Sequence, residues 1–399
     1  MVTGESVIYA AGWVQIADDF NKEEAMKKIA KIQNRKRSGD AVSRRLALQA
    51  LGFSVLSPLT ADAELMEEFQ AEKSSAHTRF LFVTDTHYLA QKENPTLMDE
   101  ASAAVCRRLV QTMNQLAGTE IPQYAGGGLV DGIQGVIHGG DLIDSGDKRG
   151  KLYDQMSKTE FQRFETDFGL TGRDGLLQYP VYEIHGNHDG PQGDTIAVDG
   201  IKRRNKQRLG LGHRSTNGLH YSWDWGNVHF VNLGIVVGES GNDLQRRRYH
   251  PLGSLRFLKK DLKRMDDPDR PIVITHHIDI ARYCLPYQSD EERFLKMEWH
   301  PQDVQSYYQA VQEHRVIAGL FGHTHARNVY GWDGTKSRQP FDKSRIDLFN
   351  GDNASHFAGQ KQAFLYMDIG PKRMIVREIA TSDAWRNYRW SDQVWGKTI

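Results

Sequence analysis

The sequence predicts an α/β fold, in the broad sense that includes α+β proteins, and two observations carry this prediction. From residue 79 onward, short apolar runs rich in β-forming residues alternate with segments of helical periodicity, the order typical of a parallel sheet. In the second half of the chain, alternating runs joined by turn residues add antiparallel strands. A chain of 399 residues is long enough to bury a large core of this kind.

The expected elements can be followed in order along the chain. The clearest is a helix over 97–116, in which Val105, Leu109, Met113 and Leu116 recur on one face. The first half is also expected to contain strands over 80–83, 135–137 and 180–184 and a helix over 160–168. The second half is expected to contain a hairpin of strands 219–225 and 228–233, a helix over 255–265, and strands over 272–275 and 316–321.

Three further segments are less regular. Strand-like pieces after Gly331 are expected to form a second sheet packed against the first, over 346–349, 363–369 and 374–379. The basic segment 191–219 is expected to be a loop, either at the rim of a pocket or simply solvated. The Trp-rich tail from Trp385 onward is expected to pack against the sheet, because aromatic clusters mostly bury area.

Composition excludes several classes of protein. Lys and Arg together number 51, as do Asp and Glu, so the formal net charge is zero and no strong general attraction to nucleic acid is expected. Two cysteines exclude a disulfide framework and a cysteine-rich zinc site. No apolar run reaches the roughly 18–20 residues of a membrane-spanning helix.

The N-terminus is expected to carry an export signal. We expect residues 1–75 to be an extension of a single catalytic domain over 76–399. Within it, the pair Arg44-Arg45, an apolar stretch and Ala61-Asp62-Ala63 are typical of a twin-arginine signal over 26–63, with an over-extended start before it. This predicts a periplasmic protein. The alternative is a basic amphipathic helix at the terminus of a cytoplasmic protein.

Five short polar segments each follow an apolar, β-rich run, and they carry the chemistry. They are Asp85-Thr86-His87, Gly140-Asp141, Gly186-Asn187-His188-Asp189, His276-His277 and Gly322-His323-Thr324-His325. Strand ends are where α/β sheets place their sites, so these segments are expected to meet. Carboxylate, amide and imidazole ligands together suit manganese, iron or zinc, and argue against a metal selected by thiolates.

The order of these segments resembles the calcineurin-like metallophosphoesterase family, over roughly residues 79–326. The resemblance implies a four-layer αββα sandwich, with two mixed β-sheets flanked by helices, that holds two divalent metal ions. One metal would be bound by Asp85, His87 and His325, and the other by Asn187, His276 and His323. Asp141 would bridge both.

The resemblance also implies a mechanism and roles for neighbouring residues. Two metals would activate a bridging hydroxide that attacks phosphorus in line. His188 would protonate the leaving group as general acid, with Asp189 orienting its ring. Asp144 is expected to support the site through hydrogen bonds. His277 is expected to be a neighbour of the site, because strand alternation points it away from His276.

The leading function is therefore hydrolysis of a small-molecule phosphate mono- or diester; the substrate and the oligomeric state stay open. No Tyr follows Asp141 closely, which disfavours the tyrosinate-iron type of purple acid phosphatase. A nuclease is the first alternative, against which zero net charge and expected export both argue. A non-catalytic scaffold is the second, but it would be expected to lack a ligand or His188, and none is missing.

Overall fold

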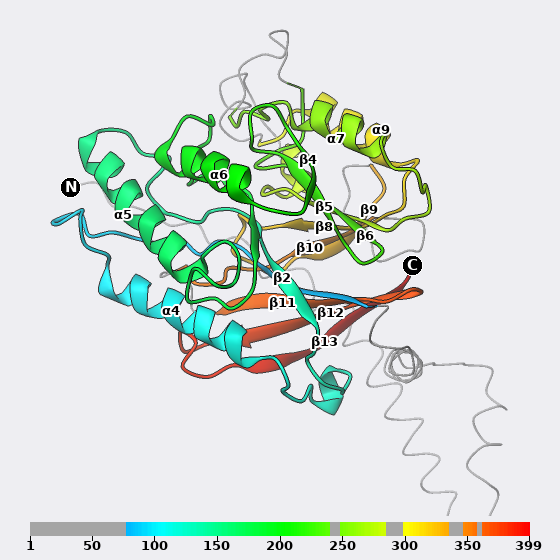
Figure 1. Ribbon diagram of the computed structural model, residues 1–399, viewed down its shortest axis with the longest axis horizontal. Helices are drawn as coiled ribbons and strands as arrows, with labels where there is room; N and C mark the ends of the chain where they lie inside the picture. The colour runs from blue at the N-terminus through cyan, green and yellow to red at the C-terminus, as the bar shows by residue number, and fades with distance from the viewer. Residues whose placement is uncertain (1–76, 240–247, 285–297, 335–345, 357–360) are drawn as a thin grey trace, which may run out of the picture. The chain divides into compact units, whose positions relative to one another are not determined.

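Two mixed β-sheets packed face to face form the centre of the protein (Figure 1). The N-terminal extension, with its expected export signal over 26–63, lies outside the residues that the structure describes. Within the described part of the chain, no helix is long and apolar enough to cross a membrane. The computed structural model describes residues 77–239, 248–284, 298–334, 346–356 and 361–399.

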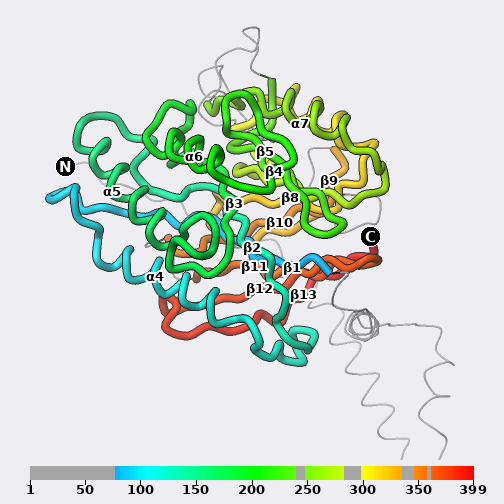
Figure 2. The backbone as a smooth tube through the Cα atoms, viewed as in Figure 1, coloured from blue at the N-terminus to red at the C-terminus, as the bar shows by residue number. Residues whose placement is uncertain are grey.

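The first sheet joins the start of the described chain to its end, in the order β13-β12-β11-β1-β2-β3. Strands β1, β2 and β3 run parallel, whereas β11 pairs antiparallel with β1. Figure 2 shows this pairing as the blue start of the described chain beside its orange and red end. The strands are β1 (Thr78–Val83), β2 (Ile133–His138), β3 (Val181–Glu183), β11 (Gln362–Ile369), β12 (Arg373–Thr381) and β13 (Arg389–Thr398).

The second sheet has the order β4-β5-β6-β7-β8-β10-β9. Strands β6, β7, β8 and β10 run parallel in its middle. The hairpin predicted at Gly226-Asn227 is confirmed, because Trp225 of β5 pairs with Val228 of β6. The strands are β4 (Leu211–Arg214), β5 (Tyr221–Trp225), β6 (Val228–Asn232), β7 (Ile272–Thr275), β8 (Val316–Phe321), β9 (Val329–Trp332) and β10 (Ile346–Asn350).

Helices cover the outer face of each sheet (Figure 1). Helices α4 (Glu100–Gln115), α5 (Lys151–Phe168) and α6 (Ile196–Gln207) pack on the first sheet. Helices α7 (Ser254–Leu262) and α9 (Pro301–Val311) pack on the second. Two short 3-10 helices, η3 (Gln123–Ala125) and η4 (Ile280–Cys284), lie in connections.

Strand β1 illustrates how the layers arise. Successive side chains of a strand point to opposite faces of the sheet. Leu81 and Val83 therefore join the core beneath the helices, whereas Phe80 and Phe82 join the core between the two sheets. All four side chains are fully buried, as expected for a central strand covered on both faces. The αββα sandwich predicted from the family resemblance is thus confirmed.

Two predicted details of the fold are wrong. The three C-terminal pieces do not form one second sheet: 346–349 lies beside β8 in the second sheet, whereas 363–369 and 374–379 complete the first sheet as β11 and β12. The segment 191–219 is not a loop throughout, since it contains α6 and β4. The expected packing of the tail is confirmed, because Trp385 and Trp390 are buried in the core beneath the helices.

This topology brings all the predicted motifs to one region. Strands β1, β2 and β3 are parallel, so their carboxyl ends lie at the same edge of the first sheet. Strands β7, β8 and β10 are parallel in the second sheet, and their ends also share an edge. Contacts between side chains that follow these strands, described below, show that the two edges meet.

Candidate metal centre

The first group of side chains forms where β1 and β8 end. His87 Nε2 lies 3.0 Å from His325 Nε2, and His325 Nε2 lies 3.2 Å from Asp85 Oδ1. Asp85 and His87 are buried, whereas 31% of the His325 side chain is exposed. The structure thus brings together the three residues predicted to bind one metal.

Asp141 lies between this group and a second one. Its Oδ2 atom is 3.6 Å from His87 Nε2 on one side and 3.0 Å from His277 Nε2 on the other. Its Oδ1 atom accepts a hydrogen bond from the backbone N–H of His188 at 2.8 Å, which orients the carboxylate. One carboxylate in contact with both groups is the arrangement that a bridging ligand requires.

The second group contains His277, Asn187 and His323. His277 Nε2 is 3.2 Å from Asn187 Oδ1, and the rings of His277 and His323 are 5.4 Å apart. Donor atoms of Asp141, His277 and His323 lie within 4.8 Å of one another, so these groups could hold a metal ion. Asn187 and His323 are therefore where the sequence predicts them.

The structure places His277, and not His276, at the second group. His276 is fully buried among Trp299, Tyr307 and Phe321, and its Nδ1 donates to the carbonyl oxygen of Ile278 at 2.9 Å. It therefore packs beneath the helices of the second sheet, away from the group. His277, predicted to be only a neighbour, takes its place.

The carboxylate of Asp189 contacts backbone N–H groups, whereas the sequence predicted a contact with the ring of His188. Its carboxylate accepts hydrogen bonds from the backbone N–H groups of Gly186, Ile143 and Leu142 at 2.7, 3.0 and 3.2 Å. It thereby ties the loop that carries Asn187 to the loop that carries Asp141, and no described contact joins it to the ring of His188.

The ring of His188 is oriented by Asp144 instead. His188 Nδ1 donates to the backbone carbonyl of Asp144 at 3.1 Å, which leaves Nε2 for proton transfer. The ring is 4.8 Å from that of His87, and 31% of the side chain is exposed. Asp144 also places its carboxylate 3.3 Å from His87 Nδ1, so its predicted supporting role agrees with its position.

The imidazoles share a hydrogen-bonding pattern that suits metal binding. Metal-binding histidines usually hold one ring nitrogen against a protein acceptor and direct the other at the metal. His277 Nδ1 donates to Gly139 O at 2.8 Å, and His87 Nδ1 faces Asp144. His323 Nε2 lies 3.1 Å from Glu298 Oε1. In each ring the other nitrogen is left for the centre.

The buried carboxylates of the site favour bound positive charge. Burial alone would lower the pKa of His87, but Asp144, Asp85 and Asp141 raise it to about 10. Burial likewise opposes the charge on His277, yet Asp141 raises its pKa to about 9. Burial would raise the pKa of Asp85, but His325 and His87 hold it well below its ordinary value. The carboxylates therefore attract positive charge, which divalent cations would supply.

The backbone at the centre is strained. Asp85, His87, Asp141, His323 and His325 all have positive φ angles, between 45° and 71°. Residues other than glycine rarely adopt this left-handed region of φ, and strained backbone of this kind is common at functional sites. Here the left-handed backbone conformation directs the side chains of these five residues toward the same centre.

Sequence reasoning missed two residues at the centre. Glu298, which contacts His323 Nε2, also binds Arg248 at 3.2 Å and Arg282 at 2.5 Å. No motif marks it. His356 lies beside His87 and follows β10 in the run Asn350-Gly-Asp-Asn-Ala-Ser-His356. His356 could have been identified from the sequence, because it lies in a sixth polar segment that follows a β-rich run.

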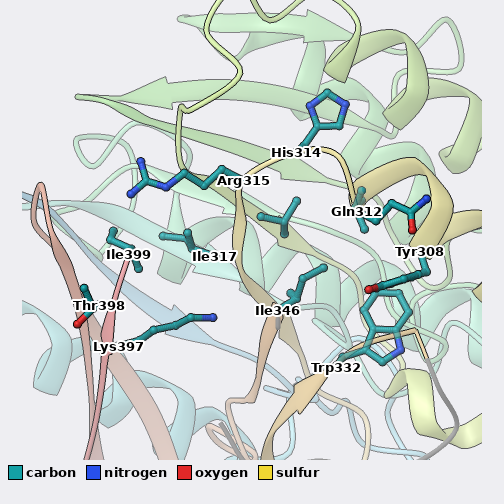
Figure 3. Close-up of a pocket in the computed structure, with 12 residues that line it drawn as sticks. Tyr308, Gln312, His314, Arg315, Ile317, Trp332, Ile346, Lys397, Thr398 and Ile399 are labelled. Atoms are coloured by element: carbon teal, nitrogen blue, oxygen red, sulfur yellow. The ribbon is translucent and has the colours of Figure 1, made fainter. Parts of the chain in front are cut away.

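The basic residues of segment 191–219 have other roles. Arg204 and Arg208 are buried and pair with Glu183 at 2.8 Å, so they serve the fold. A separate hollow between the end of α9 and the end of β13 is shown in Figure 3. Trp332 and Lys397 help to line it, and no predicted site residue does.

Comparison with known proteins agrees with the geometry. The model of the calcineurin-like phosphoesterase family matches residues 78–327. Purple acid phosphatase 23 of Arabidopsis thaliana is 29% identical over 149 residues, which are 37% of this chain. The chain spans only 28% of that relative's length.

Solved structures with similar folds are distant in sequence. Purple acid phosphatase PPD1 from yellow lupin (Lupinus luteus) seeds has 13% identity and a TM-score of 0.49, covering 82% of this chain and 54% of its own. A dimetal phosphatase from Danio rerio has 14% identity and a TM-score of 0.45, covering 80% of this chain and 98% of its own.

Proposed function

The chain belongs to the calcineurin-like phosphoesterase family, and from this premise we propose that it is a two-metal hydrolase of phosphate mono- or diesters. In this proposal Asp85, His87 and His325 hold one divalent cation, and the cations are manganese, iron or zinc. Asp141, which lies between the two groups, would be shared by both cations. The second is held by Asn187, His277 and His323.

One observation carries the proposal: Asp141 stands between two groups of metal-binding side chains, with His188 beside them on the exposed side. When bound, two divalent cations would bind phosphate oxygens, neutralise the charge that develops, and lower the pKa of a water molecule. The protein supplies the rest. Asp189 and Gly139 hold the loops and rings in place through backbone contacts.

His188 is the general acid in this proposal. Its Nδ1 is held by the carbonyl of Asp144, so its Nε2 can carry the proton for the leaving oxygen. The ring adjoins His87 at the edge of the centre, where a substrate would enter. A proton delivered there makes departure of a basic alkoxide possible.

A cationic edge favours an anionic substrate. Arg248 and Arg282 flank Glu298 next to His323, and 38% and 35% of their side chains are exposed. Guanidinium groups bind phosphate oxygens with matched geometry. A monoester, with two negative charges, would gain more from this edge than a diester with one.

The experiment is a screen of protein reconstituted with manganese, iron or zinc. p-Nitrophenyl phosphate is compared with bis-p-nitrophenyl phosphate, cyclic nucleotides, glycerophosphodiesters and single-stranded DNA. We expect hydrolysis of at least one ester, with the monoester preferred. Absence of turnover with every metal and substrate would contradict the proposal and favour a scaffold; turnover of DNA alone would favour the nuclease.

We also propose that residues 1–75 precede the catalytic domain and that 26–63 direct export through the twin-arginine route to the periplasm. Support comes from the order of Arg44-Arg45, the apolar stretch and Ala61-Asp62-Ala63. N-terminal sequencing of the protein isolated from cells tests this. A first residue near Glu64 is expected, whereas an intact Met1 in a cytoplasmic fraction would contradict it.

A further inference from the structure

The segment 351–356, which follows β10, is hydrogen-bonded to the loop that carries Asp85 and His87. The N–H of Ala354 donates to the carbonyl of Thr84 at 2.9 Å, and Ser355 Oγ donates to the carbonyl of Thr86 at 3.0 Å. Both acceptors are immediate neighbours of predicted metal ligands in sequence. Two successive residues of this segment are therefore hydrogen-bonded to the backbone on either side of Asp85.

Asn350, the last residue of β10 before this segment, is bonded to the loop that carries His323 and His325. Asn350 Nδ2 donates to the carbonyl of Gly322 at 3.0 Å and to Thr324 Oγ1 at 2.8 Å. From behind, Trp385 Nε1 donates to the carbonyl of Ala354 at 2.6 Å. Hydrogen bonds from three parts of the chain therefore fix residues 350–355, which a solvated connection would not need.

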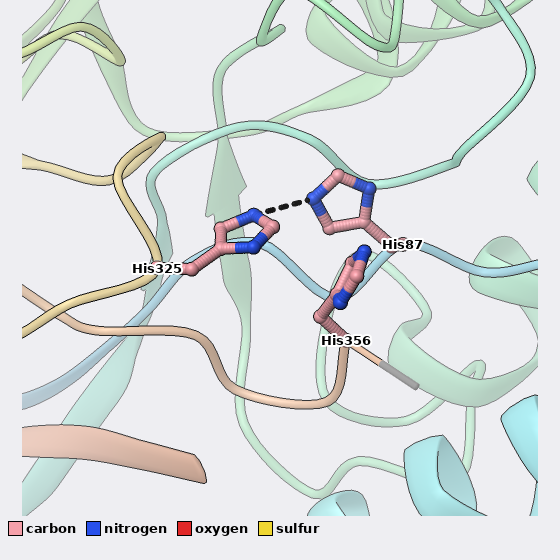
Figure 4. A group of neighbouring side chains, drawn as sticks. All are labelled: His87, His325 and His356. Atoms are coloured by element: carbon pink, nitrogen blue, oxygen red, sulfur yellow. Dashed lines mark hydrogen bonds between the residues drawn. The ribbon is translucent and has the colours of Figure 1, made fainter. Parts of the chain in front are cut away.

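His356, the residue after Ser355, is placed beside the first group as a result (Figure 4). Its ring centroid is 4.6 Å from that of His87 and 4.5 Å from that of His325. Nitrogen atoms of the three rings lie within 4.8 Å of one another. Resting on the function proposed above, we propose that His356 is a third imidazole ligand of the first metal.

This assignment changes the chemistry of the first metal site. With His356 the site offers three imidazoles and the carboxylates of Asp85 and Asp141, whereas the second site offers two imidazoles, an amide and the shared carboxylate. Imidazole is a ligand that suits zinc, and three imidazoles form one of the ligand sets known for catalytic zinc. The two sites should therefore differ in metal preference, with the preference for zinc over manganese larger at the first site than at the second.

The test is metal binding by the full chain carrying His356→Ala or His356→Gln, with His314→Ala as a matched control. His314 lines the separate hollow beside β13, away from the centre. Zinc content is measured by elemental analysis after equilibration with graded zinc buffers. X-ray absorption then gives the average number of imidazoles per bound zinc. Circular dichroism checks that each variant is folded.

We expect both His356 variants to bind one of two zinc ions at least about tenfold more weakly and to lose one imidazole signal, whereas His314→Ala matches the wild type. Unchanged affinity and imidazole count in both His356 variants would overturn the inference, and a loss of turnover alone would then assign His356 to the substrate. Failure of the proposed function would give a different result from failure of this inference. In that case the wild type would bind two metals but hydrolyse no ester.

Discussion

At the scale of single residues, His188 lies beside the centre, and we propose it as the general acid. Its Nδ1 contacts a backbone carbonyl, and its exposed ring adjoins His87. We expect His188→Ala to lower turnover of an alkyl phosphate about 10²–10⁴-fold, because a general acid contributes that much when the leaving group is basic. Turnover of p-nitrophenyl phosphate should fall much less, since p-nitrophenolate departs without a proton.

Steady-state kinetics on the two esters, with metal content measured on the same samples, checks this prediction. His314→Ala is the control for removal of an imidazole elsewhere. Equal losses on both esters, or loss of metal from His188→Ala, would assign His188 to metal binding or to phosphate binding in place of proton transfer.

Asp141 is the residue on which both groups depend. Its carboxylate lies 3.6 Å from His87 Nε2 and 3.0 Å from His277 Nε2. Asp141→Asn keeps an oxygen of similar shape but removes the negative charge and one metal-binding oxygen. We therefore expect both metal equivalents to bind more weakly, as measured by elemental analysis after gel filtration.

Asp174→Asn is the matched control, because Asp174 bonds only to its own turn among the described contacts. This variant should keep both metals. Retention of two equivalents by Asp141→Asn would contradict the bridging role.

At the scale of elements, the contact between α6 and β3 depends on a buried ion cluster. Burial alone would raise the pKa of Glu183, but Arg204 and Arg208 lower it to about 2 from an ordinary 4.5. Because the folded-state pKa lies below the unfolded value, the stabilisation is complete above about pH 4.5. It is lost as the pH falls from there toward 2.

We expect Glu183→Gln to lower the free energy of unfolding by about 3–5 kcal/mol at pH 7, since two buried guanidinium groups lose their carboxylate. The difference from wild type should shrink as the pH is lowered below 4.5. Urea denaturation at pH 7 and pH 3.5 measures it. Asp194→Asn, which breaks the exposed pair with Arg149, should cost less than about 1 kcal/mol; an equal cost for both variants would contradict the role of burial.

The same cluster explains why α6 could not be predicted from its sequence. Its buried apolar positions are only Ala197, Val198 and Ile201, and Gly200 stands where a longer side chain would overlap Phe161. The helix is stabilised by tertiary contacts of Arg204 that a single sequence does not reveal. By contrast α4 was predictable, because its apolar face is continuous.

At the scale of the whole molecule, the motif order predicted the sandwich and most of the centre, but not which histidine of the pair faces it. Strand alternation places His276 and His277 on opposite faces. Every residue of β7 is buried, so burial could not tell the face toward the helices from the face toward the site. Ile272 and Ile274 join the core beneath the helices, and His276 continues that face.

The centre joins loops from both sheets, so its metals should stabilise the entire fold. Asp85 and Asp141 follow strands of the first sheet, and His277 and His323 follow strands of the second. A cation that binds only the folded arrangement adds about 2.7 kcal/mol per site at one hundred times its Kd. Removal of metal with EDTA should therefore lower the Tm by roughly 5 °C or more in a chain of this size.

Thermal unfolding followed by circular dichroism, with EDTA and then with excess zinc, checks this last prediction. Asp141→Asn is the internal control, because a variant that binds neither cation well should unfold at nearly the same temperature in both conditions. EDTA could instead remove the metal and leave the Tm of the wild type unchanged. The loops at the edges of the two sheets would then have to be held together by contacts between their own side chains. Pairs such as His277 with Asp141 and His325 with Asp85 would then carry that stability without a cation.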